Sequence, residues 1–491
     1  MRGVSAVKDV QGAYHHGVPL HPSTPKGRGL WARVPRGYGA LGYPKWSNGV
    51  EYVLMIVGNV PGRQDAGVIW GKEYGKFLRE CGFQQSRIDR RLYYRRGAGG
   101  ELTIVCVYVD DNRIVANSRE VFERFSAEFN KRVPDSLGEG LLAASVEEDF
   151  AGVKYERGRF GEVEKIELSC RRRLLSDLRA KLDALPVGEQ LRAGTSTDTP
   201  MDEHALTAMR ASQQTEEKLG PGMVKKAQQI AGLDGWIATS CRPDTYFAYV
   251  ALSQHLGHGL TPTVWNALLR WASYLAGTPE LMPTYYSDGV GKQWEVFADS
   301  SLFNAGGAGS FGGYVARFPG SGVFAWKSFV PRKLGDSSGA AETNMAAHAV
   351  HYIEGQRMPA KELGFGARGA TLLHTDNPAT LQGTGMEQVP LAQRYMGARR
   401  DILRSAKEGG RVELQSVDTS DNLADMMTKP LPRDKFVALR ALLLGIRPVP
   451  DGTEGGRRTR RFGVISDNIG RPHNAVVTPA SCLPDSHSLP R

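Results

Sequence analysis

Residues 102–118 read LTIVCVYVDDNRIVANS. The apolar run from Leu102 to Val109 is too short for a membrane span and is rich in Val and Ile, so it predicts a buried strand. Two carboxylates, Asp110 and Asp111, interrupt the run, and a second apolar piece follows at 114–116. The pattern therefore predicts a strand, an acidic turn and a second strand. Two interpretations are open: a turn that merely favours Asp and Asn, or a pair of carboxylates that buried strands deliver to a divalent metal.

Length, composition and net charge limit the number of domains and the class of protein. The chain has 491 residues, which is room for two or three domains, and a hydrophobic fraction of 41% is enough to build their cores. No apolar run approaches the length of a membrane span, and we expect neither a transmembrane segment nor a secretory signal. The net charge of +10 favours a polyanionic partner such as nucleic acid, although a solvated basic surface would look the same.

The five cysteines are scattered singly, and their spacing suggests neither a zinc site nor a disulfide framework. They are Cys81, Cys106, Cys170, Cys241 and Cys482. A reducing, intracellular location is the resulting expectation.

Apolar periodicity predicts alternating helices and strands over most of the chain. The expected helices are 66–81, 120–133, 175–185, 224–239, 243–256, 263–277, 341–354, 393–407 and a final one. The expected strands are 51–57, 149–155, three short ones after residue 294, 371–376 and 411–417. The polar stretch 186–222 is interpreted as a linker, and the Gly-, Pro- and Arg-rich tail after residue 450 as disordered.

The first half of the chain contains a third candidate acid, Asp9, which ends a short strand near the N-terminus. Magnesium ions need several hard oxygen ligands from different strands, and a substrate phosphate fills the remaining positions. Neighbouring strand residues point to opposite faces, so Asp110 and Asp111 cannot be equivalent ligands. We predict Asp110 to be the stronger one.

With these residues the chain resembles the reverse transcriptase and ribonuclease H part of a copia-type LTR retrotransposon polyprotein. Tyr108-Val109-Asp110-Asp111 matches that family's YVDD box, and residues 9–14, DVQGAY, match its upstream Asp-Val-x-x-Ala-Phe box. The resemblance implies that Tyr14 is the aromatic residue that excludes a ribose 2′-hydroxyl.

Shorter matches follow in the family's order from about residue 4 to 445. Residues 61–70 resemble the segment that packs against template and nucleotide, with Gly62, Ala66 and Trp70 in register but its Tyr and Pro replaced. Residues 150–153 resemble the primer-contacting strand Phe-Leu-Gly-Ile, which includes Gly152. Thr199-Pro200-Met201, Arg242-Pro243-Asp244 and the stretch 274–278 match segments beyond the polymerase.

A second acidic set lies in the other half: Asp299, Glu342, Asp376 and Asp425. Taken singly, each acid reads more simply as a cap or turn residue. Asp425 lies in LADMMTKPL, however, which matches the family's closing motif nearly residue for residue, and the strand and helix order resembles the ribonuclease H fold. In that fold four carboxylates gather two metals that cut RNA. The family's acidic helix start has lost one acid here, and Glu342 is the acid that remains in register.

Two departures from the family pattern affect activity. The Lys-His-Ile-Asp segment appears as RYMG at 394–397, which keeps only a basic residue. The finger elements that hold the nucleotide lie ahead of the first Asp box in the family, and this chain begins almost at that box. His15 and His16 lack partner spacing and read as ordinary turn residues.

The sequence thus predicts an α/β (α+β) chain: a reverse transcriptase palm with a thumb-like region at 1–205 and a helical connection at 206–290. A ribonuclease H-like domain with a mixed five-stranded sheet follows at 291–445, and a tail at 446–491. The predicted function is RNA-directed DNA polymerase, impaired by truncation, with ribonuclease H activity, each active site using two Mg²⁺ or Mn²⁺ ions.

The expected partners are RNA template, DNA primer, RNA/DNA hybrid and deoxynucleotide triphosphates, with oligomers or other Pol products possible, in the cytoplasm or nucleus. A non-enzymatic remnant or co-opted nucleic-acid-binding protein is the alternative. An unrelated two-metal phosphotransferase is a third reading, which the closing motif disfavours.

Overall fold

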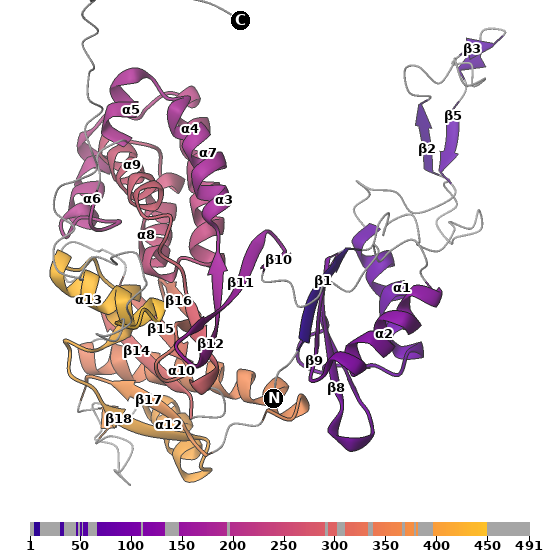
Figure 1. Ribbon diagram of the computed structural model, residues 1–491. Coiled ribbons are helices and arrows are strands. Elements are labelled where there is room, and N and C mark those ends of the chain that lie inside the picture. The colour runs from indigo at the N-terminus through magenta and orange to yellow at the C-terminus, as the bar shows by residue number, and fades with distance from the viewer. Residues whose placement is uncertain are drawn as a thin grey trace, which may run out of the picture. The chain divides into compact units, whose positions relative to one another are not determined.

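A computed structural model describes the chain in segments (Figure 1). The described residues are 4–9, 30–33, 46–47, 50–51, 53–56, 66–109, 111–132, 147–193, 197–289, 293–301, 310–331, 337–365, 369–377, 380–381 and 396–448. Asp110, Tyr14, Gly62, the two turn histidines and the predicted tail beyond residue 448 lie outside them. Every helix within these ranges is too short or too polar to cross a bilayer.

The quoted stretch forms the predicted hairpin, which lies in an antiparallel sheet. β8 (Leu102–Tyr108) pairs with β9 (Asp111–Ala116), and the full strand order is β1-β9-β8-β7-β6, with β1 (Val4–Asp9), β7 (Leu92–Arg96) and β6 (Gln84–Gln85). Two short antiparallel pairs also occur, β2 (Leu30–Arg33) with β5 (Val53–Ile56) and β3 (Trp46–Ser47) with β4 (Val50–Glu51).

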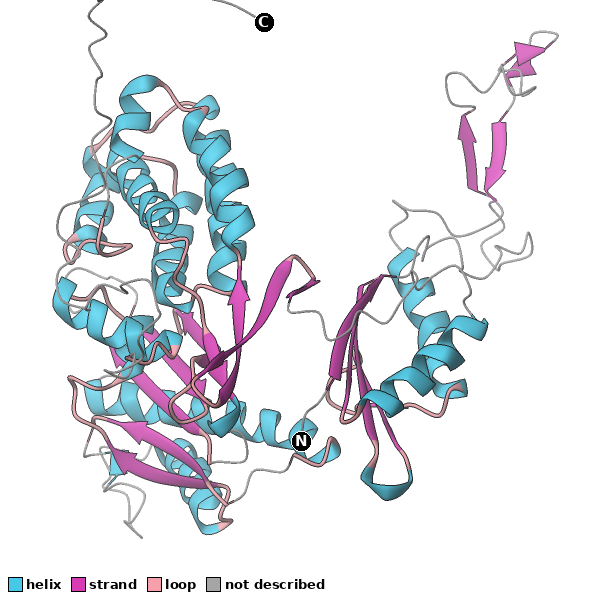
Figure 2. Cartoon of the chain, viewed as in Figure 1, coloured by secondary structure: helices cyan, strands magenta, loops and turns pink. Residues whose placement is uncertain are grey.

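Two amphipathic helices cover one face of this sheet, as Figure 2 shows. They are α1 (Ala66–Glu80) and α2 (Arg119–Arg132), close to the predicted bounds. Trp70 and Leu78 on α1 and Phe122 and Phe125 on α2 pack in one buried cluster with sheet residues such as Ile114. The helical spacing of apolar residues thus decided both elements.

A second antiparallel sheet follows: β10 (Glu147–Phe150), β11 (Val153–Phe160), β12 (Val163–Ser169) and β13 (Thr284–Tyr286). The prediction of one strand at 149–155 is wrong, because a tight turn divides it into a hairpin. Ala151 and Gly152 both adopt positive φ, 52° and 80°, at that turn. Two consecutive residues with positive φ form a tight hairpin turn, which glycine favours. A single Gly in an apolar stretch is only a weak sequence signal for such a turn.

Helices fill the middle of the chain. α3 (Arg171–Arg173) continues through a π-helical turn (Leu174–Leu178) into α4 (Arg179–Asp183), so the helix predicted from residue 175 begins four residues earlier. α7 (Pro221–Ser240), α8 (Tyr246–Gly257) and α9 (Pro262–Gly277) lie where the periodicity predicts helices, with a 3-10 turn at Pro243–Thr245.

The linker predicted at 186–222 is wrong over about half of its length. It contains α5 (Val187–Ala193) and α6 (Ala205–Thr215). Leu206 and Met209 of α6 are fully buried in the helical core. Because α6 buries only a narrow stripe, its exposed positions are polar and resemble a loop in sequence.

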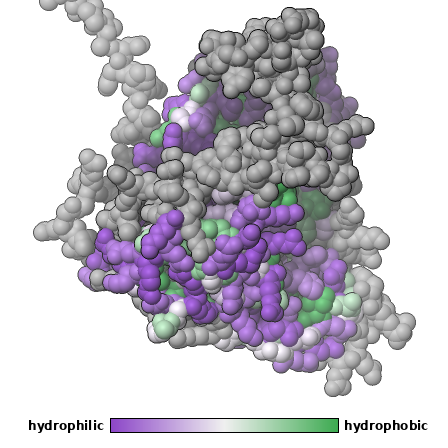
Figure 3. Space-filling model, turned by 90° about the vertical axis from the view of Figure 1, so that its right-hand side faces the viewer, coloured by the Kyte–Doolittle hydropathy of each residue, from purple (hydrophilic) through white to green (hydrophobic). Residues whose placement is uncertain are grey.

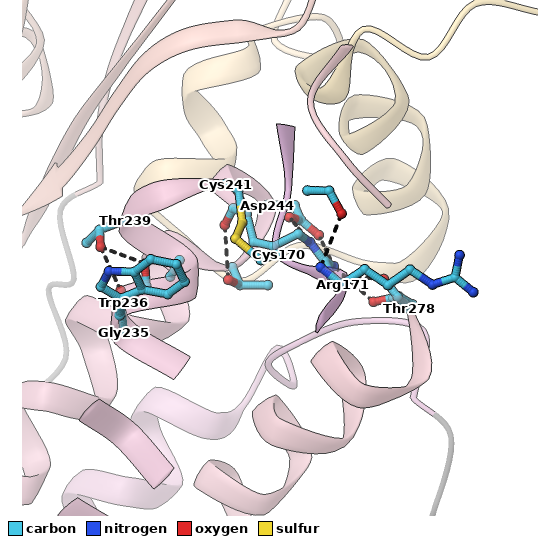
Figure 4. Close-up of a disulfide and its surroundings, with 12 residues drawn as sticks. Cys170, Arg171, Gly235, Trp236, Thr239, Cys241, Asp244 and Thr278 are labelled. Carbon is cyan, nitrogen blue, oxygen red and sulfur yellow. Dashed lines mark hydrogen bonds and ion pairs between the residues drawn. A yellow bond between two sulfur atoms is a disulfide. The ribbon is translucent and has the colours of Figure 1, made fainter. Parts of the chain in front are cut away.

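A disulfide joins Cys170, just before α3, to Cys241, just after α7 (Figure 4). The expectation of unpaired cysteines is therefore wrong, and cysteine usage no longer argues for a reducing compartment. The two residues are separated by 71 positions and meet only through the fold, so sequence spacing could not reveal them. Cys81 and Cys106 take no part in this disulfide.

The last block is a mixed five-stranded sheet with strand order β16-β15-β14-β17-β18. β14 (Glu295–Ser301), β15 (Phe311–Arg317) and β16 (Val323–Phe329) are antiparallel, and β17 (Thr371–Thr375) and β18 (Val412–Ser416) run parallel to β14. The predicted mixed α/β class is confirmed.

Both faces of this sheet are covered. α10 (Ser338–Glu362) and α12 (Gly397–Glu408) pack against Val296 and Ala298, whereas the turn Leu423–Met427 and α13 (Arg433–Leu444) pack against Phe297. α10 begins three residues before its predicted start, where the side chain of Ser337 caps it. It also runs eight residues past its predicted end and includes Pro359, because its buried face continues to Ala360.

Candidate functional site

Three of the four acids predicted in the second half meet at one edge of the five-stranded sheet. Asp299 lies near the C-terminal end of β14, Asp376 directly follows β17, and Glu342 lies in the second turn of α10. One carboxylate oxygen of each lies within 4.8 Å of the other two. They meet because β14 and β17 are parallel neighbours whose C-terminal ends share an edge.

Burial gives this triad unusual electrostatics. Asp299 is 2% exposed and Glu342 is 7% exposed. Burial raises the pKa of Asp299 to about 7; nearby Lys429 opposes the shift and Asp425 adds to it. Burial, followed by the charges of Asp299 and Asp376, raises the pKa of Glu342 to about 9. Three acids so close together cannot all ionise without a compensating cation.

The donors around the triad fit a hard cation. Ser300 donates to Glu342 Oε1 from its backbone N at 3.2 Å and its Oγ at 3.0 Å, while Oε2 is buried without a hydrogen-bond partner in the described part of the chain. The other faces of the cluster are carboxylate oxygens, which Mg²⁺ and Mn²⁺ prefer. Asp299, Glu342 and Asp376 are therefore the residues that could hold such an ion.

The fourth acid, Asp425, is placed differently. It is fully buried in the turn Leu423–Met427, and both of its oxygens face ammonium groups. Lys429 Nζ lies 2.7 Å from Oδ1, and Lys435 Nζ lies 2.6 Å from Oδ2. Lys429 Nζ also lies 3.5 Å from Asp299 Oδ2, so Asp425 adjoins the triad through a lysine.

Sequence reasoning missed Lys429 and Lys435, and also Thr428, whose hydroxyl donates to Asp299. Burial alone would lower the pKa of Lys429, but the charges of Asp299 and Asp425 outweigh it, and the net shift is upward. A signal was present, because Lys429 follows Asp425 by four residues, the spacing at which helical side chains meet.

The other acidic site is described in part. β1 pairs with β9 so that Asp9 lies opposite Asp111, and Tyr108 lies opposite Asp111 across the hairpin. The register therefore brings the backbones of Asp9 and Asp111 together. Asp111 Oδ2 accepts a hydrogen bond from the backbone N of Ala151 at 3.2 Å, which ties the hairpin to the turn between β10 and β11.

Val109, just before Asp110, has a φ of 58°, which is rare for a β-branched residue. Its carbonyl accepts a 2.6 Å hydrogen bond from the indole Nε1 of Trp70. Strain of this kind persists only when surrounding structure enforces it, and it concentrates at functional sites.

The remaining predicted contacts of this half surround the turn. Tyr108 is 47% exposed, and its ring makes an edge contact with Phe150 at a centroid distance of 6.5 Å. A Cβ at Gly152 would lie 3.0 Å from Arg173 Nη2, so the turn packs closely against the end of α3. Beside it is a polar cleft that three consecutive arginines, Arg171–Arg173, help to line. On the face drawn in Figure 3 the described surface is mostly hydrophilic, with small separate hydrophobic areas.

No model of a known protein family matches the chain. Curated relatives do: the Pol polyprotein of transposon RE2 of Arabidopsis thaliana is 25% identical over 410 residues, 82% of this chain and 26% of that protein. The Pol polyprotein of transposon TNT 1-94 of Nicotiana tabacum is 22% identical over 381 residues, 76% of this chain and 27% of that protein. The Gag-Pol polyprotein of Ty1-JR2 of Saccharomyces cerevisiae is 22% identical over 408 residues, 79% of this chain and 22% of that protein.

The chain thus spans about a quarter of the length of these relatives. Among solved structures, a foamy viral protease-reverse transcriptase in complex with double-stranded DNA is 12% identical, with a TM-score of 0.41, over 85% of this chain and 68% of that one. The N-terminal RNase H domain of a Mycobacterium tuberculosis protein is 16% identical, with a TM-score of 0.21, over 30% of this chain and 96% of that one. The relatives that match over about four fifths of this chain include copia-type Pol polyproteins of plant transposons, as the sequence motifs predicted.

Proposed function

We propose that the chain is the reverse transcriptase and ribonuclease H portion of a retrotransposon Pol polyprotein, and that its second half hydrolyses the RNA strand of RNA/DNA hybrids. The observation that carries the proposal is the triad of buried Asp299, buried Glu342 and half-buried Asp376, of which one carboxylate oxygen each lies within 4.8 Å of the others. The homology to Pol polyproteins supports the choice of substrate class.

The proposed domains follow the sequence boundaries: palm and thumb-like region at 1–205, helical connection at 206–290, ribonuclease H-like domain at 291–445 and a tail at 446–491. The strand order β16-β15-β14-β17-β18 supports the third of these. The cellular setting we propose is the cytoplasm, in an element particle, or the nucleus.

In the proposed nuclease, divalent cations bound by the carboxylates would polarise the scissile phosphate and lower the pKa of the attacking water. The chain's own residues prepare this site. Ser300 donates two hydrogen bonds to one oxygen of Glu342, which leaves Oε2 buried without a partner in the described residues, and Thr428 donates to Asp299. Burial and the charges of Asp299 and Asp376 raise the pKa of Glu342, so a cation held by the triad would favour the ionised form of its carboxyl. The full set of four acids corresponds to two ions, as the family resemblance implies.

In the first half we propose nucleotidyl transfer, in which a primer 3′-hydroxyl attacks the α-phosphate of a deoxynucleotide on an RNA template. Asp9, Asp110 and Asp111 would hold the metals, and the opposed register of Asp9 and Asp111 supports this set. Tyr14, Gly62, Tyr108 and Gly152 are the proposed substrate contacts. The cleft at Arg171–Arg173 has lining of both charge signs, with Lys154 adding to its basic side chains and Asp149, Glu156 and Asp177 opposing them, so the proposal of a nucleic-acid partner for this half rests on the homology to Pol polyproteins.

The test is cleavage of a hybrid of labelled RNA and unlabelled DNA by the purified full chain with Mg²⁺ or Mn²⁺. We expect shortened RNA, and loss of cleavage by about 100-fold or more in Asp299→Asn because a metal-binding charge is removed. Asp401→Asn is the matched control, because Asp401 is an exposed acid on α12. This variant should cleave the hybrid like the parent protein.

A non-enzymatic binder would give a different result. It would retard the hybrid in a gel with a steep salt dependence and leave the RNA intact. Intact RNA with a folded, binding-competent sample would refute the nuclease proposal.

A further inference from the structure

The ammonium group of Lys429 lies between two of the predicted metal ligands. Its Nζ is 2.7 Å from Asp425 Oδ1 and 3.5 Å from Asp299 Oδ2. Both carboxylates are buried, with relative exposures of 0% for Asp425 and 2% for Asp299, so solvent screens this arrangement poorly. Lys429 thus places one positive charge at the junction of the triad with the fourth acid.

That junction is where a divalent ion shared by Asp299 and Asp425 would have to bind. Carboxylate oxygens coordinate Mg²⁺ at about 2.1 Å, closer than the ammonium contacts. An ion bound to both carboxylates would add its charge beside the ammonium group, and the two positive charges would repel each other in a poorly screened site. Binding of such an ion therefore competes with the contact between Lys429 and Asp299.

Asp425 is also held from its other side. Lys435 Nζ lies 2.6 Å from Oδ2 and donates to the backbone O of Thr419 at 2.8 Å. Glu342 contrasts with this arrangement, because no ion pair of the described residues includes its carboxylate, and its Oε2 is buried without a hydrogen-bond partner there. Asp425 is thus the acid whose charge two lysines balance, whereas Asp299 shares only Lys429, at 3.5 Å, within the described chain.

We propose, building on the nuclease function above, that Lys429 is a positioning residue that occupies the second cation position of the free site. The free protein then binds one divalent ion through Asp299, Glu342 and Asp376. A second ion enters only when Lys429 leaves Asp299, so loading of the site is sequential and passes through movement of this side chain.

The test is the stoichiometry of Mn²⁺ binding to the full chain without nucleic acid, measured by the electron paramagnetic resonance of free Mn²⁺ and by calorimetry. We expect one bound ion in the parent protein. Lys429→Met should bind two, with the second site at least about 10-fold tighter than any second site of the parent. Lys429→Arg, which keeps a cation at the position, should again bind one.

Lys435→Met is the matched control. Lys435 contacts the same carboxylate, but its contacts with acids in the described chain do not include Asp299. The variant should therefore keep one ion. Circular dichroism checks that each variant is folded. Should Lys429→Met not fold, Asp425→Asn gives the second measurement: its first ion should keep its affinity within about threefold, because Asp425 is not a ligand of that ion.

Each outcome decides a different claim. Two tight ions in the parent, or one ion in both the parent and Lys429→Met, would overturn the role of Lys429 and leave the nuclease proposal standing. Loss of the first ion in Asp425→Asn would overturn it as well. No bound Mn²⁺ in any folded protein would overturn the metal site itself, and the proposed function with it.

Discussion

Replacing Asp244 by Asn should strongly destabilise the helical middle of the chain. Arg242 and Asp244 form a bidentate ion pair, with Nε to Oδ1 at 2.9 Å and Nη2 to Oδ2 at 2.8 Å. Their side chains are only 1% and 0% exposed. Arg242 also donates to the backbone O and hydroxyl of Thr278, near the disulfide in Figure 4. The Tyr274 hydroxyl donates to Asp244 at 2.7 Å.

The expected loss follows from this burial. Removing one partner of a buried ion pair costs about 3–5 kcal/mol, because the other charge stays buried without compensation. Tyr274→Phe removes a single hydrogen bond to a charged group and should cost about 1.5–3 kcal/mol. The double variant Arg242→Met with Asp244→Leu should lose less than the sum of its single changes, since no charge is left unpaired.

The pH dependence gives an independent check. Burial alone would raise the pKa of Asp244, but the charge and hydrogen bonds of Arg242 outweigh it and lower the pKa below its ordinary 3.8. A depressed folded pKa contributes stability above the unfolded value, and this stability is lost as pH falls through the folded value. The difference between parent and Asp244→Asn should therefore shrink below pH 3.8.

The assay is urea unfolding followed by tryptophan fluorescence, which reports on Trp265 and Trp271 in the same helical core. A loss below about 1 kcal/mol for Asp244→Asn at pH 7, or strict additivity in the double variant, would refute this account of the network.

Three further predictions concern a buried acid, the disulfide and the carboxylate triad. Asp234 on α7 is fully buried, and neither carboxylate oxygen has a hydrogen-bond partner in the described segments. Burial raises the pKa of Asp234, so the folded protein loses stability as pH rises and this carboxyl must ionise. Asp234→Asn should therefore raise the free energy of unfolding by about 1–3 kcal/mol at pH 7 in urea, and should leave it unchanged near pH 3. Reduction of the Cys170–Cys241 disulfide, which joins residues separated by 71 positions, should cost up to about 4 kcal/mol. Cys170→Ser should show the same melting temperature with and without reductant. Asp376→Asn should weaken Mn²⁺ binding by at least about 10-fold in calorimetry, whereas Asp401→Asn should bind like the parent.

Much of the fold followed from local pattern. The strands β14 to β18 and the helices α1 and α2 lie where the pattern places them, because each has a clear period and a turn or cap at its ends. The wrong predictions fall where the local sequence carries little information about the structure. α6 buries only a narrow stripe, the turn at Ala151 and Gly152 has a single weak signal, and Cys170 meets Cys241 only through tertiary structure.

The candidate site was also predictable only in part. The triad was predictable, because strand ends and a helix start carry its acids to one sheet edge. The position of Asp425 was not, because the motif includes Lys429 but does not show that this lysine and the more distant Lys435 both pair with the acid. Which of several nearby charges pair depends on burial and side-chain reach, and these come only from packing.

The central claim is that the second half cuts RNA in a hybrid. The most direct measurement compares labelled RNA paired with DNA, RNA paired with RNA, and DNA paired with DNA, each incubated with the full chain and Mn²⁺ and stopped with a chelator. The account predicts cleavage of the RNA/DNA hybrid alone, leaving 3′-hydroxyl ends, and none once the chelator is added first. An intact hybrid with folded protein, or equal cleavage of all three duplexes, would contradict it.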